Sequence, residues 1–164
     1  MPRHPWIVLA LAGAVTAGIA RDAGADISIT GYIGMTTAPT VRSTQGFAGS
    51  LGVFIVAFEF EYSRISGDDT TATPSLTMGM FNGMVQTPFV IKRLQFYGTI
   101  GGAVCHESLG NTANWSYGLN YGGGVKITIA GPLRARVDYR LFDLYGSAHT
   151  PKPQRLYAGL TLVF

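Results

Sequence analysis

The residues whose types and spacing come closest to those of an enzyme are His106 and Ser108. A histidine can act as general base for a serine nucleophile when a third group orients its imidazole ring. Residues two apart on a strand share one face, so a strand running through them would bring both side chains together. The match is only three residues long and lies in a polar segment, residues 106–114, which we predict to be a loop. We therefore expect no enzymatic activity from this pair.

Charged residues at alternate positions form a second candidate group. Every second residue of 134–140 is charged, and Glu59 and Glu61 are spaced in the same way. Such alternation places the charges on one face of a strand. Buried charges must be paired or neutralised, so if this face is enclosed, its charged side chains need oppositely charged partners. The seven residues concerned are Glu59, Glu61, Lys126, Arg134, Arg136, Asp138 and Arg140.

Other kinds of chemistry have no matching pattern in the sequence. It contains no cluster with metal-ligand spacing, no phosphate-binding glycine loop and no nucleotide fingerprint. The three glycines at 122–124 lie within a strand-like run, where they ease packing. We expect no metal and no cofactor.

The composition indicates a β-protein with few charges. Charged residues make up 13% of the 164 residues, about half the share of a typical soluble domain, and the mean hydropathy is +0.24. After the N-terminal segment no stretch is long and apolar enough for a transmembrane helix. An apolar soluble β-protein and a transmembrane β-barrel therefore remain. The net charge of +3 without a basic cluster argues against nucleic acid as a partner.

The N-terminal residues have the pattern of a secretory signal peptide. A short basic start is followed by an apolar run over 6–20 and by Ala23-Gly24-Ala25, an A-x-A site. A membrane anchor is the alternative, but the run is short for a span and no charge cluster follows it. We predict cleavage after Ala25, with 1–25 as signal peptide and 26–164 as one domain. The single cysteine, Cys105, cannot form an intrachain disulfide, and we expect it to be a buried small hydrophobic residue.

The rest of the chain alternates with period two, the pattern of strands with two different faces. Turn and loop residues separate the alternating segments. The segments predict eight strands, near 27–37, 44–54, 56–66, 75–87, 93–105, 115–129, 133–145 and 155–164. The weak boundary lies at 54–57, which has no glycine or proline, and a single strand through 49–64 would reduce the count to seven. Eight is favoured, because it segregates short turns from longer polar loops and bacterial barrels have even strand numbers.

The larger of the two faces is apolar and aromatic, and this predicts which side faces out. An eight-stranded barrel has room inside only for side chains. Glycines and short polar groups therefore belong in the lumen, and rows such as Trp115, Tyr117 and Leu119 face lipid. The opposite arrangement, a soluble periplasmic lipocalin-like binding barrel, would place the apolar face inside and charge outside. We predict an all-β, eight-stranded antiparallel up-and-down transmembrane β-barrel, which we expect to be monomeric in outer-membrane lipid.

This pattern resembles the small outer-membrane β-barrel superfamily, of the OmpA transmembrane domain, OmpX and opacity-protein types. The resemblance covers 26–164, and its most specific part is Tyr157-x-Gly159-x-x-Leu162-x-Phe164, similar to the C-terminal assembly signal of such proteins. The first position is usually polar, and here it is tyrosine. The resemblance implies the cell outer membrane as location, reached through the periplasm, and the outer-membrane assembly machinery and periplasmic chaperones as partners.

The implied function is a structural or surface-interaction role. We hypothesise that the seven charged residues form an ion-pair network that plugs the lumen, the alternative being that the arginines near the rim are simply hydrated. A pore is disfavoured, because porins need about sixteen strands for an aqueous channel. The enzymatic alternative is a lipid-A-modifying hydrolase, since lipid-A 3-O-deacylases are eight-stranded barrels that use a histidine, a serine and an acid. The surrounding deacylase motif is missing around His106 and Ser108.

Overall fold

The described part of the chain consists of β-strands and their connections. The computed structural model describes residues 25–38, 40–67, 74–88, 93–109, 112–146 and 152–164. Its strands are β1 (Ala25–Ala38), β2 (Arg42–Val53), β3 (Val56–Ile65), β4 (Ser75–Gln86), β5 (Leu94–Leu109), β6 (Thr112–Ala130), β7 (Leu133–Gly146) and β8 (Gln154–Val163). The predicted signal peptide lies outside the described residues except for Ala25, which begins β1. Within the described ranges, no helix has the length and apolar character needed to cross a membrane.

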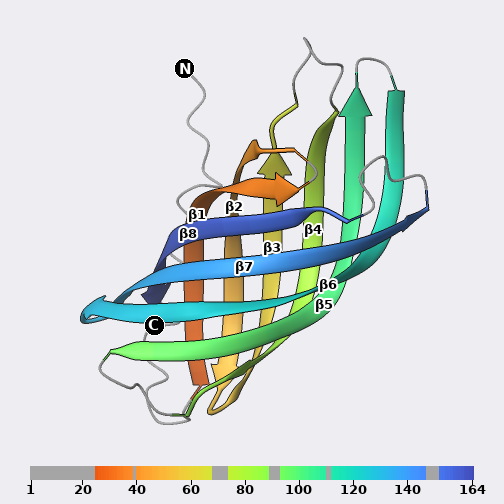
Figure 1. Ribbon diagram of the computed structural model, residues 1–164. Helices are drawn as coiled ribbons and strands as arrows, with labels where there is room; N and C mark the ends of the chain where they lie inside the picture. Colours follow the sequence, from red (N-terminus) through yellow and green to blue (C-terminus); the bar gives the residue numbers. More distant parts are fainter. Residues whose placement is uncertain (1–24, 39, 68–73, 89–92, 110–111, 147–151) are drawn as a thin grey trace, which may run out of the picture.

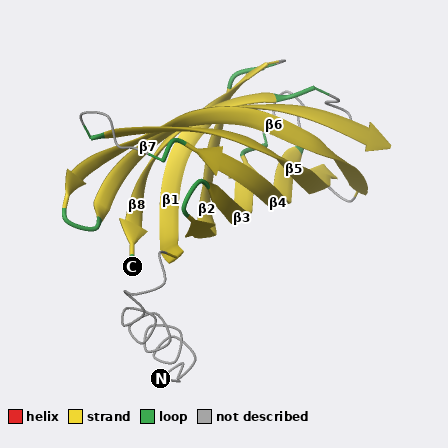
Figure 2. Cartoon of the chain, turned by 90° about the horizontal axis from the view of Figure 1, so that it is seen from below, coloured by secondary structure: helices red, strands yellow, loops and turns green. Residues whose placement is uncertain are grey.

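The eight strands form a closed up-and-down barrel. Each strand pairs antiparallel with the next in the chain, and β8 pairs with β1 from Ser28 opposite Val163 to Ala38 opposite Gln154. Figure 1 shows β7 and β8 crossing the strands of the far wall at a steep angle, as the strand tilt of a small barrel requires. Figure 2 again shows β8 beside β1. The predicted eight-stranded antiparallel barrel is confirmed, and its closure leaves no free sheet edge.

The two ends of the barrel carry different connections. The connections after β2, β4 and β6 are residues 54–55, 87–93 and 131–132, and we call their side the turn end. The connections after β1, β3, β5 and β7 are 39–41, 66–74, 110–111 and 147–153, and we call their side the loop end. The turn without glycine or proline places Phe54 at a φ of 56°, an uncommon left-handed conformation for a bulky residue. The predicted break at 54–57 is thus confirmed, and a single strand through 49–64 is wrong.

The predicted loop over 106–114 is wrong, because β5 and β6 continue through most of it. His106 lies opposite Trp115, and Glu107 lies opposite Asn114. The His106 ring packs on the Trp115 ring with 4.6 Å between centroids, while Glu107 is buried on the lumen side. Polar composition therefore does not end these strands, since each side chain finds a place on its own face.

The outer surface of the barrel is apolar, as the alternation predicts. Large apolar side chains point outward from all eight strands and are substantially exposed. Examples are Ile33, Phe47, Phe60, Phe81, Ile100, Trp115, Tyr117, Tyr139 and Leu160. A surface of this kind suits lipid, whereas a soluble barrel would carry charge there.

The lumen is more apolar near the loop end than predicted. Buried apolar side chains cluster there instead of the glycines and short polar groups that we expected. The cluster consists of Ile65, Leu76, Met78, Met80, Ala103, Cys105, Phe142 and Leu144. The expectation for Cys105 as a buried small hydrophobic residue is confirmed. The lumen prediction was incomplete because methionine and leucine fill an enclosed space as well as polar groups do, provided that water is excluded.

Lumen glycines make room for tyrosine rings. A Cβ atom on Gly124 would lie 2.5 Å from Tyr97 Oη and would also collide with the Val137 carbonyl oxygen. A Cβ atom on Gly46 would meet the Tyr32 hydroxyl in the same way. Gly124 therefore serves packing, as the sequence predicts for the run 122–124, and the missing side chains at Gly46 and Gly124 leave room for the hydroxyl groups of Tyr32 and Tyr97 in the lumen.

Candidate functional site in the barrel lumen

Three arginines and three carboxylates meet at the centre of the lumen. They come from β3, β7 and β8, and each is at most 1% exposed. We call them the central network: Glu59, Glu61, Arg136, Asp138, Arg140 and Arg155. Because β3 and β7 stand on opposite walls of the barrel, ion pairs between them cross the lumen. The formal charges of the six groups sum to zero.

Arg136 and Arg140 bridge the two walls. Arg136 makes a two-pronged contact with Glu59, through Nη1 and Oε2 and through Nη2 and Oε1, the latter pair 3.2 Å apart. Arg140 Nη1 donates to Glu61 Oε2 at 2.6 Å. Asp138 lies between the two arginines on β7 and accepts from Arg140 Nε and Nη2 at 3.2 and 3.1 Å. Forked arginine–carboxylate contacts of this kind combine strength with fixed geometry.

Arg155 completes the network, although it was not among the seven predicted residues. Its Nη2 donates to Glu61, and its Nη1 donates to Tyr32 Oη at 3.3 Å. The guanidinium also lies 5.3 and 5.1 Å from the ring centroids of Tyr32 and Tyr157, within cation–π range. The alternation of β8 already places Arg155 on the lumen face. Its partner could not be read from one strand, because that depends on how the strands align across the barrel.

Tyrosines enclose the charges. Tyr97 Oη donates to Asp138 and accepts from Arg136 Nε at 2.7 Å. Tyr32 Oη donates to Glu61, and its ring stacks on Tyr157 with 4.1 Å between centroids. The hydroxyls of Tyr32 and Tyr97 satisfy further donors and acceptors of the charged groups, which helps a buried ion pair to offset its desolvation. Arg155 Nε and Tyr157 Oη have no hydrogen-bond partner among the described residues.

Two of the predicted network residues lie apart from the carboxylates. Lys126 Nζ donates to Gln86 Oε1 at 3.2 Å, and Arg134 Nη1 donates to Gln95 Oε1 at 3.3 Å. Neither makes an ion pair with any residue that the structure describes. The structure thus brings together five of the seven predicted residues and leaves Lys126 and Arg134 nearer the turn end.

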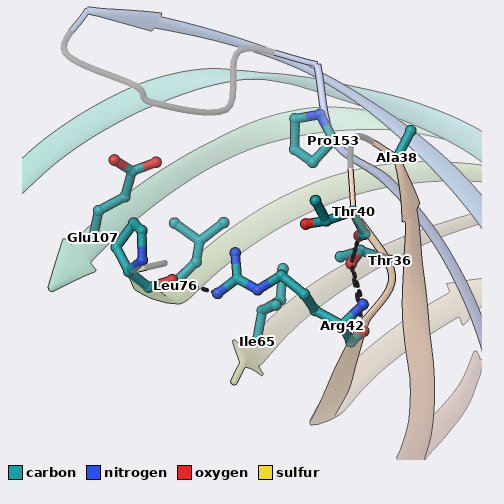
Figure 3. A pocket seen from close by; sticks show the side chains of 9 residues that line it. Thr36, Ala38, Thr40, Arg42, Ile65, Leu76, Glu107 and Pro153 are labelled. Atoms are coloured by element: carbon teal, nitrogen blue, oxygen red, sulfur yellow. Dashed lines mark hydrogen bonds between the residues drawn. The ribbon is translucent and has the colours of Figure 1, made fainter. Parts of the chain in front are cut away.

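The lumen is filled above and below the central network. At the loop end, Arg42 donates to the carbonyl oxygens of Ser66 and Pro74, and Figure 3 shows its side chain extending across a small pocket toward Leu76. That pocket and another at the turn end each have a free volume of about 10 Å³, room for about one water molecule.

The candidate enzymatic pair lacks the geometry of a dyad. His106 and Ser108 share the outer face of β5, the same face as the partly exposed Trp115 ring on which His106 packs. No hydrogen bond joins the two side chains among the described residues, and no carboxylate is hydrogen-bonded to the His106 imidazole there. Within the same ranges no group of three or more His, Cys, Asp or Glu side chains is placed to hold a metal ion.

The residues of the predicted assembly signal occupy both faces of the closing strand. Tyr157 is buried in the lumen, and Gly159 lies against Tyr32, where a Cβ would come within 2.8 Å of the Tyr32 Cβ. Leu162 and Phe164 point outward and are 47% and 45% exposed. The Phe164 amide donates to the Ile27 carbonyl oxygen at 2.8 Å, so pairing with β1 extends to that residue.

Comparison with solved structures identifies the architecture. The N-terminal β-barrel domain of Pseudomonas aeruginosa OprF superposes with a TM-score of 0.66 at 14% identity, over 85% of this chain and 97% of that one. Neisserial surface protein A gives 0.66 at 12% identity, over 86% and 97%. The chain has the fold of the small eight-stranded outer-membrane β-barrels. The attachment invasion locus protein Ail of Yersinia pestis, with a TM-score of 0.59 at 12% identity over 86% and 99%, shares this fold.

The sequence itself gives no match. No family model and no curated protein matches the chain. At identities of 12–14% the structural likeness concerns the fold alone. The predicted resemblance to small outer-membrane barrels is confirmed at that level, and the role of this protein must be argued from its own residues.

Proposed function

We propose that this protein is a monomeric outer-membrane barrel without enzymatic activity, with a structural or surface-interaction role and a lumen closed by the central network. The observation that carries the proposal is the set of three arginines and three carboxylates, balanced in charge and buried across the barrel. Such a set fixes opposite walls to each other and fills the space through which a pore would conduct. The protein then acts through its outer surface and its loop end.

The location follows from the two faces of the barrel. The exposed apolar side chains on the outside need a lipid environment, and the polar and charged side chains are enclosed. A soluble lipocalin-like barrel would need the reverse distribution. With the turn end toward the periplasm, the longest connection, 66–74, faces the cell exterior, as the long loops of bacterial barrels generally do.

Export and assembly belong to the same proposal. Cleavage after Ala25 would release a barrel domain into the periplasm, where chaperones keep it unfolded. Residues 157–164 would then present the assembly machinery with three exposed large apolar side chains, Leu160, Leu162 and Phe164, of which the last two are signal positions. The tyrosine at the first signal position is explained by packing, since Tyr157 stacks on Tyr32.

Cell fractionation combined with gel mobility tests the proposal. A folded barrel resists detergent at room temperature and migrates differently before and after boiling. We expect the protein in the outer-membrane fraction with a heat-dependent change in mobility. Recovery of the protein as a soluble periplasmic species would contradict the proposal and favour the lipocalin-like alternative.

A further inference from the structure

Two cations at the turn end of the lumen have no carboxylate partner among the described residues. Lys126 on β6 and Arg134 on β7 each donate to a neutral amide oxygen, that of Gln86 and that of Gln95. Lys126 is 6% exposed. Its ammonium group has three donors, of which the Gln86 oxygen engages one, and Nζ also lies 5.5 Å from the centroid of the Tyr97 ring, a contact that brings no full negative charge. A buried charge is normally paired with an opposite charge. We therefore expect the Lys126 ammonium group to have a negatively charged partner that is not a residue of the described chain.

The two glutamines are themselves held in place. Gln86 Nε2 donates to the Phe54 carbonyl oxygen, and Gln95 Nε2 donates to the Thr87 carbonyl oxygen, both at 3.2 Å. Because the side-chain amide nitrogens donate to these backbone carbonyl oxygens, the amide oxygens of Gln86 and Gln95 point toward Lys126 and Arg134. The two glutamine amides therefore hold Lys126 and Arg134 in place without neutralising their charge.

The neighbouring charges do not neutralise the pair. Lys126 lies opposite Arg136 and Thr128 lies opposite Arg134, so Lys126 and Arg134 are diagonal neighbours on the same face of adjacent strands. The three carboxylates of the central network already balance its three arginines. Asp26 also lines the turn-end pocket, but it is exposed to solvent, where its charge is screened.

The pocket in front of Lys126 and Arg134 has the lining of an anion site. Hydroxyl groups of Ser28, Ser50 and Thr161 share its wall with the two cations. Ser28 and Ser50 are hydrogen-bonded to each other at 2.7 Å, and Thr161 is hydrogen-bonded to Thr30 at 2.8 Å, so the accepting hydroxyl of each pair keeps its own proton to donate. Its free volume of about 10 Å³ accommodates about one water-sized particle. A chloride ion is only slightly larger than water, whereas phosphate and lipid headgroups are much larger.

We propose that the turn end of the lumen binds one small inorganic anion of halide size between Lys126 and Arg134. The anion accepts hydrogen bonds from the ammonium group, the guanidinium group and the pocket hydroxyls, and it screens the two cations from each other. This inference concerns the turn-end pocket and does not depend on whether the lumen conducts or what the outer surface binds.

Bromide and chloride are the probes for this site. In crystals of the unmodified protein soaked in bromide, we expect an anomalous peak within hydrogen-bonding distance of Lys126 Nζ. In micelles, we expect saturable broadening of the ³⁵Cl resonance that disappears when the barrel is unfolded. Absence of the bromide peak from the turn-end pocket would overturn the proposal, and this measurement needs no variant.

Matched variants test whether the saturable ³⁵Cl broadening arises from the turn-end pocket. Lys126→Gln, checked for folding by its heat-dependent gel mobility, should weaken chloride binding at least tenfold, and Arg134→Gln should weaken it several-fold. Lys152→Gln is the control, because Lys152 is exposed at the loop end, and it should leave the saturable broadening unchanged. Folded Lys126→Gln protein that binds chloride as tightly as the parent would also overturn the proposal.

Discussion

Arg140 on β7 and Glu61 on β3 meet across the lumen, with 2.6 Å between Nη1 and Oε2 and neither side chain exposed to solvent. Their strands lie on opposite walls, so this contact fixes the width of the barrel as well as neutralising two charges. Arg155 also pairs with Glu61, and Asp138 also pairs with Arg140. Removing one member therefore leaves other members unpaired.

Glu61→Gln should strongly destabilise the barrel. The substitution leaves Arg140 and Arg155 without this carboxylate, and unpairing a buried ion pair costs about 3–5 kcal/mol. Urea unfolding in lipid vesicles, followed by gel mobility, measures the change. Asp143→Asn is the matched control: its pair with the largely exposed Lys152 should contribute less than about 1 kcal/mol. Equal effects of the two variants would contradict the assignment.

Removing both partners should cost less than the two single changes predict. In the variant Glu61→Gln with Arg140→Met, two arginines and two carboxylates remain, so the lumen is again balanced. We expect a coupling free energy of about 1–3 kcal/mol in a double-mutant cycle. Additive effects would mean that the two residues stabilise the barrel independently.

Gly124→Ala should destabilise the barrel, because the new methyl group collides with the Tyr97 hydroxyl and the Val137 carbonyl. Overpacking of this kind costs about 1–3 kcal/mol. Gly102→Ala is a control on the outer face, where a Cβ would meet nothing within 4 Å, and it should be close to neutral. The same unfolding measurement compares the two. A destabilised Gly102→Ala with an unaffected Gly124→Ala would disprove the packing role.

Deletion of Phe164 should reduce assembly in cells more than any change in the loop-end connections. Phe164 is exposed on the outer face and pairs with Ile27 at the seam between β1 and β8. The measurement is the heat-modifiable fraction in outer membranes, compared with refolding of purified protein into detergent micelles. A defect in cells together with normal refolding is the result expected of an assembly signal. Normal assembly of the deletion variant would show that the segment was misinterpreted.

Ser108→Ala should leave the acylation pattern of lipid A unchanged. His106 packs on Trp115, and no hydrogen bond connects it to Ser108 in the described part of the chain. Mass spectrometry of lipid A from cells with the parent protein, the variant or neither provides the test. Loss of an acyl chain that depends on Ser108 would establish the enzymatic alternative.

The strands were predictable from the sequence because their two faces differ chemically. The predicted boundaries of β3 and β7 lie within one residue of those observed. The turn at Phe54 has no glycine or proline and was found only from the strand count. The ends of β5 and β6 were missed, because residues 106–109 pair with residues 112–115 across the hairpin, so the polar composition does not end the strands.

The central network was predictable only in part. Alternation alone places Glu59, Glu61 and the four charged residues of 134–140 inside the barrel. Whether two of these groups meet depends on strand register and tilt, which bring Arg155 to Glu61 and leave Lys126 beside Gln86. These are relations between distant strands, and no local pattern in the sequence encodes them.

Electrical recording on the purified protein in a planar bilayer tests the closed lumen most directly. With the central network intact and the end pockets water-sized, we predict no steady ion current through the unmodified protein at neutral pH and moderate voltage. Protein that is shown to be folded and inserted, yet carries a steady current, would contradict the account.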